Sequence, residues 1–88
     1  MKSYVLIFKT SISTTYERSN AIDKLNESCE KIKMATIDID DEDKILRIES
    51  TRDDSDTISL TMQKEGYPIL LLAVYEQHTD MPILVASN

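Results

Sequence analysis

The spacing of the apolar residues changes several times along this chain of 88 residues, and these changes constrain its fold more than any other feature. Residues 4–10 favour a β-strand and are apolar at their centre, from Tyr4 to Phe8, which predicts a strand buried on both faces. Further along, apolar residues recur three and four positions apart, which predicts the buried face of a helix. The residues with this spacing are Ile22, Leu25, Cys29 and Ile32.

The start of this helix is marked by Thr14 and Glu17, which match a capping box. In such a box the hydroxyl accepts a hydrogen bond from a backbone N–H of the first helical turn. The carboxylate reaches back to a backbone N–H at the start of the helix. The sequence therefore predicts a short loop after the first strand and a helix that begins at this box.

From Met34 onward the apolar period becomes two, which is typical of strands with one buried face. Two segments with this period, residues 34–39 and 45–50, flank an acidic turn at residues 40–43 and predict a β-hairpin. Alternate residues share one side of each segment: Ala35, Ile37 and Ile39 in the first, and Leu46, Ile48 and Ser50 in the second.

A second helix and a last strand follow the hairpin. Polar residues 51–56 form a loop that can cap the helix, and two apolar residues four positions apart place its buried face. A glycine followed by a Tyr-Pro pair ends the helix, and residues 69–76 predict the last strand. The possible caps are Ser55 and Asp56, the apolar positions are Ile58 and Met62, and the helix stop is Gly66, Tyr67 and Pro68.

The resulting order is strand, helix, strand, strand, helix, strand. Two such units predict an α+β, ferredoxin-like βαββαβ fold, in which a four-stranded antiparallel sheet carries both helices on one face. We expect residues 1–78 to form this domain and residues 79–88 to form a C-terminal extension. The extension is apolar, so we expect it to pack on the open sheet face or on a partner. Its main apolar residues are Met81, Ile83, Leu84 and Val85.

Four segments of the chain stand in an order and spacing that resemble the heavy-metal-associated (HMA) domain family. They are FKTSI at 8–12, SNAIDKL at 19–25, IDIDDEDKILRI at 37–48 and MQKEGY at 62–67. The resemblance covers residues 4–74 and is to the domain of copper chaperones and of the N-terminal modules of metal-pumping ATPases. It implies the same ferredoxin-like fold. It also implies a metal loop between the first strand and the first helix, where the family carries a C-x-x-C pair.

The chain departs from the family at this motif, because Thr14 and Glu17 stand where the two cysteines would be. Soft thiolates suit Cu(I), whereas a hydroxyl and a carboxylate are hard donors. Cys29 is the only cysteine, so neither an intrachain disulfide nor a two-thiolate site can form. We therefore expect that soft-metal binding is lost at this loop and that the chain carries no cofactor.

The sequence offers other candidate metal ligands besides a cysteine pair. An alternative set of ligands without cysteine is Glu17, Met34, His78 and Met81. The acidic segment from Asp38 partly matches a calcium loop, but Asp43 occupies the sixth position, where that loop requires glycine. A solvated hairpin turn is the favoured interpretation of that segment. Cys29 lies on the apolar helix face, which favours a buried, inert thiol.

The formal net charge of −6 disfavours nucleic acid and anionic membranes as partners. The chain has no Gly-rich phosphate loop, nucleophile elbow or paired-carboxylate signature, so we do not expect an enzyme. Residues 1–8 are too short for a signal peptide, and the longest apolar run, residues 69–75, is too short to span a bilayer. We expect a cytoplasmic protein.

The expected function is that of a non-catalytic HMA-like module that acts through protein–protein contacts or homodimerisation. The candidate contact patch is Tyr16, Tyr67, Met81, Ile83, Leu84 and Val85. One alternative is a heavy-metal binding or transport protein that uses ligands other than cysteine. A third class, a small-ligand regulatory domain on the same fold, has no binding motif in the sequence.

Overall fold

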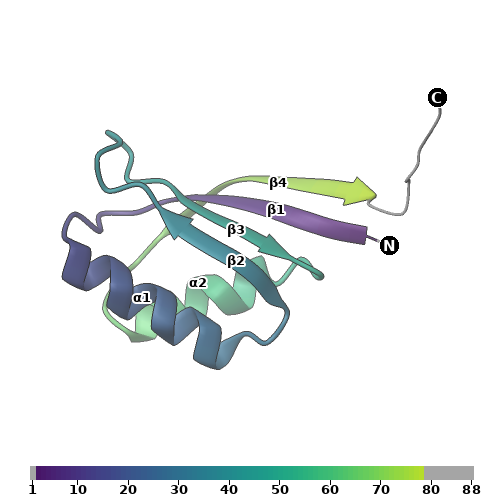
Figure 1. Cartoon of the computed structure of the whole chain (residues 1–88), viewed down its shortest axis with the longest axis horizontal. Helices are drawn as coiled ribbons and strands as arrows, with labels where there is room; N and C mark the ends of the chain where they lie inside the picture. Colours follow the sequence, from purple (N-terminus) through teal and green to yellow (C-terminus); the bar gives the residue numbers. More distant parts are fainter. Residues whose placement is uncertain (1, 79–88) are drawn as a thin grey trace.

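The computed structural model describes residues 2–78, and its element order is the predicted one (Figure 1). The elements are β1 Lys2–Lys9, α1 Thr15–Ser28, β2 Ile32–Ile37, β3 Leu46–Ser50, α2 Ser55–Lys64 and β4 Leu70–His78. The candidate contact residues Met81, Ile83, Leu84 and Val85, and the rest of the C-terminal extension, lie outside the described residues.

The four strands form one antiparallel sheet in the order β2-β3-β1-β4. Both helices cover the same face of this sheet, which confirms the ferredoxin-like α+β fold (Figure 1). Within the described residues, β1 and β3 are the central strands, and β2 and β4 are the edges. The central position of β1 explains its continuous apolar run, because Leu6 and Phe8 are fully buried and Val5 is also buried.

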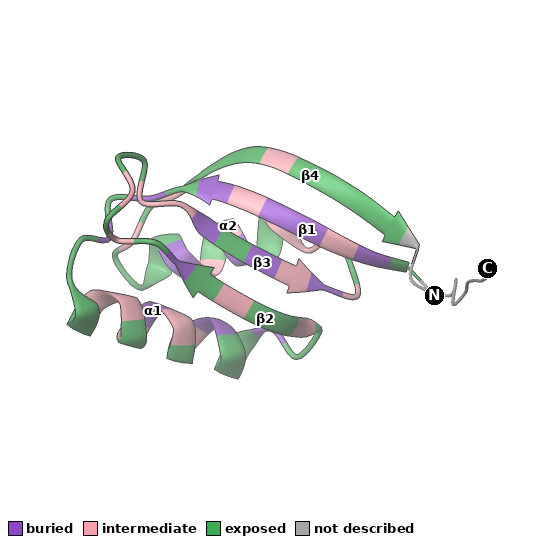
Figure 2. Cartoon of the chain, turned by 45° about the horizontal axis from the view of Figure 1, so that its top comes forward, coloured by how far each residue is buried: buried purple, intermediate pink, exposed green. Residues whose placement is uncertain are grey.

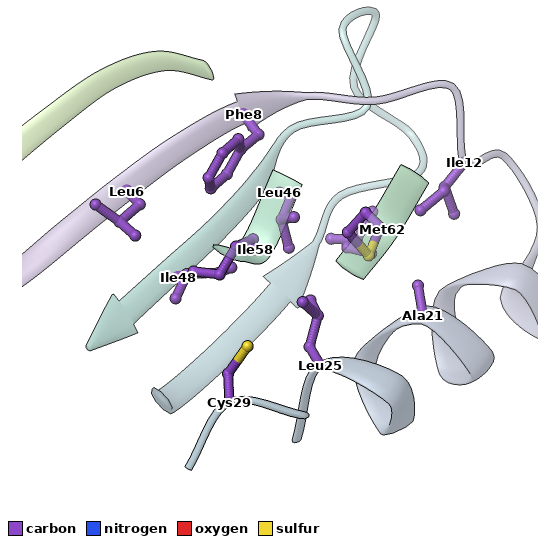
Figure 3. Close-up of a cluster of buried hydrophobic side chains, with 11 residues drawn as sticks. Leu6, Phe8, Ile12, Ala21, Leu25, Cys29, Leu46, Ile48, Ile58 and Met62 are labelled. Atoms are coloured by element: carbon purple, nitrogen blue, oxygen red, sulfur yellow. The ribbon is translucent and has the colours of Figure 1, made fainter. Parts of the chain in front are cut away.

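The hydrophobic core lies between the inner sheet face and the two helices (Figure 3). Alternate strand residues point into it, as the period of two predicts: Arg47 is exposed between the buried residues Leu46 and Ile48. Burial of each such aliphatic side chain contributes about 1.5–3 kcal/mol. The helices and the β1–α1 loop contribute Ala21, Leu25, Ile58, Met62 and Ile12.

The end of α1 differs from the prediction. The helix stops at Ser28, with Cys29 as its C-cap, so Ile32 is not a helical residue and instead begins β2. Long-range contacts decide this boundary, because the Lys31 carbonyl accepts hydrogen bonds from Thr51 N–H at 3.1 Å and from Ser50 Oγ at 3.2 Å. These contacts hold the chain against β3, where Ile32 still packs against the core.

The start of α2 also differs from the prediction. Its N-cap is Asp54, rather than Ser55 or Asp56, and the Asp54 side chain makes no capping hydrogen bond. The Asp53 carboxylate instead accepts a hydrogen bond from Ser55 N–H at 3.2 Å, which occupies one amide at the start of the helix.

The end of α2 is a Schellman motif, as the Gly66-Tyr67 pair predicts. Gly66 has a φ of +89°, and its N–H donates to the Gln63 carbonyl at 3.1 Å. Tyr67 N–H donates to the Met62 carbonyl at 2.8 Å. The Tyr67 side chain packs against the core, which completes the motif with its usual hydrophobic contact.

Candidate functional site

At the β1–α1 junction, Thr14 and Glu17 form the predicted capping box. Glu17 N–H donates to Thr14 Oγ1 at 3.1 Å, and the same hydroxyl donates to Glu17 Oε1 at 3.2 Å. The carboxylate also accepts from Ser13 N–H at 3.2 Å, so it reaches the residue before the N-cap. Both oxygen-bearing side chains are thus engaged in the cap. As hard donors they do not fit the soft metal that the family resemblance implies.

The loop before this cap is fixed at its start by Thr10. The Thr10 hydroxyl donates to the Lys44 carbonyl at 2.6 Å and accepts from Ile12 N–H at 3.1 Å. Thr10 N–H donates to the Asp43 carbonyl at 3.2 Å. The buried Ile12 side chain anchors the loop to the core. The junction is therefore held between the hairpin turn and the core.

Two candidate contact tyrosines have different environments. Tyr16 lies in the first turn of α1 and is highly exposed. Tyr67 is half-buried, and its hydroxyl accepts a hydrogen bond from Asn20 Nδ2 at 2.9 Å. Asn20 follows Tyr16 by one helical turn, so α1 carries both residues on one side. The structure holds Tyr67 in place and leaves Tyr16 open to a partner.

The alternative metal ligands do not come together. Glu17 follows the C-terminal end of β1, whereas His78 pairs with Lys2 at the opposite end of that strand. A strand of this length spans about 25 Å. Met34 is exposed on β2, and Met81 lies outside the described residues. In the described part of the chain, no three His, Cys, Asp or Glu side chains form a group that could hold a metal ion.

The acidic β2–β3 connection is a turn, as the sequence predicts, and its carboxylates bind backbone amides. Asp38 Oδ1 accepts from Asp40 N–H at 3.0 Å, and Asp41 Oδ1 accepts from Asp43 N–H at 2.7 Å. Lys44 adopts a positive φ of 51°, and its ammonium donates to the Ile39 carbonyl at 2.8 Å. These contacts are those of a self-stabilised turn.

Cys29 is a buried thiol at the end of α1. Burial raises the pKa of this thiol, and the nearby Asp54 carboxylate raises it further, while a hydrogen bond with Thr61 opposes the shift. A raised pKa keeps the group protonated at neutral pH, which disfavours nucleophilic chemistry. An open depression beside Cys29 is lined by polar residues that include Arg52 and Asp54, whose charged groups lie 3.5 Å apart.

The largest departure from an ordinary domain surface is β4. Figure 2 shows this strand exposed along nearly its whole length, and within the described residues no strand pairs with its outer edge. Its exposed fractions are 61% for Leu70, 39% for Leu71, 48% for Leu72, 38% for Val74 and 56% for Tyr75. Five large apolar side chains thus lie uncovered on one edge strand. Exposed apolar side chains gathered on one unpaired edge strand are characteristic of an interaction site.

The open sheet face is less apolar away from β4. At its centre Val5 is buried between Glu49 on β3 and Tyr75 on β4, which lie directly opposite it on the neighbouring strands. Arg47 and Glu49 form an ion pair at 3.7 Å on the β3 part of this face. The apolar surface therefore concentrates at β4. The sequence contained the signal for this, because in a ferredoxin-like sheet the last strand is an edge strand.

Comparison with known proteins assigns no family: no protein-family model matches this chain, and no curated protein matches it significantly. The HMA resemblance remains a prediction from the four quoted segments. Across residues 2–78, no helix is long and apolar enough to cross a membrane.

Proposed function

We propose that this chain is a non-catalytic HMA-like module that has lost soft-metal binding at the usual loop and acts through contacts with another protein. Homodimerisation is the simplest form of such contact. The observation that carries the proposal is the uncovered apolar strand β4, in which residues 70–75 include five large exposed side chains. Exposed apolar surface of this extent is kept where a partner covers it.

The β1–α1 junction supports the loss of soft-metal binding. Thr14 and Glu17 satisfy each other and two backbone amides without a metal. A capping box of this kind stabilises a helix start by itself. We therefore assign the junction a structural role and place the function on the sheet edge.

Charge and geometry together favour a protein as the partner. The net charge of −6 repels the phosphates of nucleic acids and of anionic lipids. An unpaired strand edge presents backbone N–H and C=O groups that another extended strand can satisfy. A partner that supplies a strand also buries the apolar side chains that flank the edge.

Metal titration of the full chain tests this proposal against the metal-handling alternative. We expect calorimetry with Cu(I), Zn(II) and Ni(II) to show no binding tighter than micromolar. Thr14→Cys/Glu17→Cys is the matched control, because it restores the thiolate pair and is expected to gain Cu(I) affinity. Tight binding by the unmodified chain would overturn the proposal in favour of metal handling.

Amide hydrogen exchange tests the interaction role separately. The outward amides of β4 should exchange faster than those of the central strand β1 when the chain is dilute. If the dilute monomer instead protects β4 as strongly as β1, the chain itself covers the edge, and the interaction role is refuted.

A further inference from the structure

The two edges of the sheet differ in how well they are guarded against pairing. β2 has six residues, carries the exposed Lys33, and has a register irregularity between Ile32 and Met34. A short edge strand with a lysine and a bulge resists pairing. β4 has nine residues with no lysine, arginine or proline, and its only carboxylate is Glu76. Both edge strands carry a register shift, because the pairing of β4 with β1 also shifts, between Ile7 and Phe8. Greater length and the absence of lysine are therefore what distinguish β4 from β2.

The apolar side chains of β4 project from both faces of the sheet. Val74 is paired in register with Leu6, and Leu71 with Phe8, which places them on the helix side. Leu6 and Phe8 are fully buried, yet Val74 and Leu71 are 38% and 39% exposed because the helices stop short of this edge (Figure 1). Tyr75 lies on the open face. A strand added beside β4 would cover both rows at once.

Local charge on β4 is balanced although the whole chain is acidic. Lys2 Nζ lies 2.9 Å from Glu76 Oε2, and the Tyr4 hydroxyl donates to the same oxygen at 3.4 Å. If β4 pairs with itself about Val74, the two Glu76 residues lie four positions apart, about 14 Å along the strand. That separation exceeds the Debye length of about 8 Å at physiological salt, so repulsion between them is largely screened.

We propose that the partner of β4 is the β4 strand of a second copy of this chain, paired antiparallel across a twofold axis. This inference rests on the proposed function and names its partner. It joins two four-stranded sheets into one sheet of eight strands. The contact is isologous and leaves only the guarded β2 edges at the ends, so assembly stops at two copies.

The length of β4 limits the area that this dimer can bury and therefore its affinity. A strand of nine residues is about 30 Å long, and a sheet with side chains on both faces is about 10 Å thick. The projected contact of about 300 Å² is small beside the roughly 800 Å² per partner of a standard stable interface. The dimer therefore belongs to the weak class, and we expect micromolar dissociation.

Sedimentation velocity on the full chain, from low micromolar to millimolar concentration, measures this equilibrium. Leu72→Lys and Tyr75→Lys each place a charge on β4, and each enters the twofold contact twice. We expect either substitution to weaken dimerisation about 100-fold. Matched controls are Leu60→Lys on α2 and Met34→Lys on β2, because both residues are 52% exposed and lie away from β4. We expect these controls to dimerise within about twofold of the unmodified chain.

The outcomes separate this inference from the proposed function. Weakening by the β4 substitutions, with an unchanged melting temperature of the dilute monomer and unaffected controls, supports pairing through β4. Met34 lies on edge strand β2, in register with Glu49 of the open face, so weakening by Met34→Lys means that dimers form through the open face or the β2 edge, and it refutes the inference. A monomer at every concentration also refutes it, while fast β4 exchange in that monomer leaves the proposed function standing with a different protein partner.

Discussion

Replacing Thr14 by alanine tests the conclusion that the β1–α1 junction is a self-sufficient helix cap. The substitution removes the acceptor that lies 3.1 Å from Glu17 N and the hydroxyl that lies 3.2 Å from Glu17 Oε1. Loss of an N-cap threonine costs about 1 kcal/mol. The junction is exposed, so water satisfies the freed amide and the cost does not approach that of a buried unsatisfied group. For a domain of this size, 1 kcal/mol lowers the melting temperature by about 4–8 °C.

Thermal and urea unfolding followed by circular dichroism measure this change. Thr14→Ser keeps the hydroxyl and should remain close to the unmodified chain. Thr15→Ala, at the neighbouring exposed threonine, should stay within about 0.5 kcal/mol. The reasoning fails if Thr14→Ala is as stable as Thr14→Ser, because the hydroxyl would then contribute nothing to the cap.

Replacing Glu17 by alanine tests the same capping box through its other side chain. Glu17→Ala removes the carboxylate from both Ser13 N–H and the Thr14 hydroxyl. Because Thr14 and Glu17 share one contact, the free energies of unfolding lost in the two single variants should sum to more than the loss in the double variant. Strict additivity would show that the two side chains act independently and that the box is not a unit.

Three further predictions concern the rest of the fold. Gly66→Ala should lower the free energy of unfolding in urea by about 1–2 kcal/mol, because the φ of +89° strains any residue with a side chain. Steric contact is not the cause, since no atom lies within 4 Å of the added Cβ. Gly66→Asn should recover part of this loss. Leu46→Ala empties a fully buried position and should cost about 2–5 kcal/mol, whereas Leu60→Ala, at an exposed position, should cost far less. The raised pKa of Cys29 means that the unfolded chain loses its thiol proton first as pH rises. The stability advantage over Cys29→Ala should therefore decline once pH passes the ordinary thiol pKa of 9.0, and an advantage unchanged at about pH 10 would contradict the assigned burial.

The order of elements and the inward faces could be predicted from the sequence because both depend on local periodicity. Alternation places Leu46 and Ile48 in the core, with Arg47 exposed between them, and the structure agrees. The capping box and the Gly66 helix stop are equally local, since each depends on residues within a few positions of one another.

The boundaries and the candidate site depended on contacts that periodicity does not contain. Ile32 has helical spacing, but hydrogen bonds from β3 and the following loop to the Lys31 carbonyl place it in a strand. Composition alone also cannot distinguish a buried central strand from an exposed edge strand, since β1 and β4 are both apolar runs. Their different exposure follows from sheet order and from where the helices end, which are properties of the whole fold.

The unequal protection of the two sheet edges also determines which assemblies are possible. If both edges were open, β4 of one copy could pair with β2 of the next, and such a head-to-tail contact would continue into a filament. The exposed Lys33 and the short length of β2 oppose that contact. β4 is then the edge that can pair. Antiparallel pairing of two β4 strands leaves neither β4 edge open. Because Lys33 and its short length keep β2 unpaired, self-pairing through the apolar β4 closes at two copies.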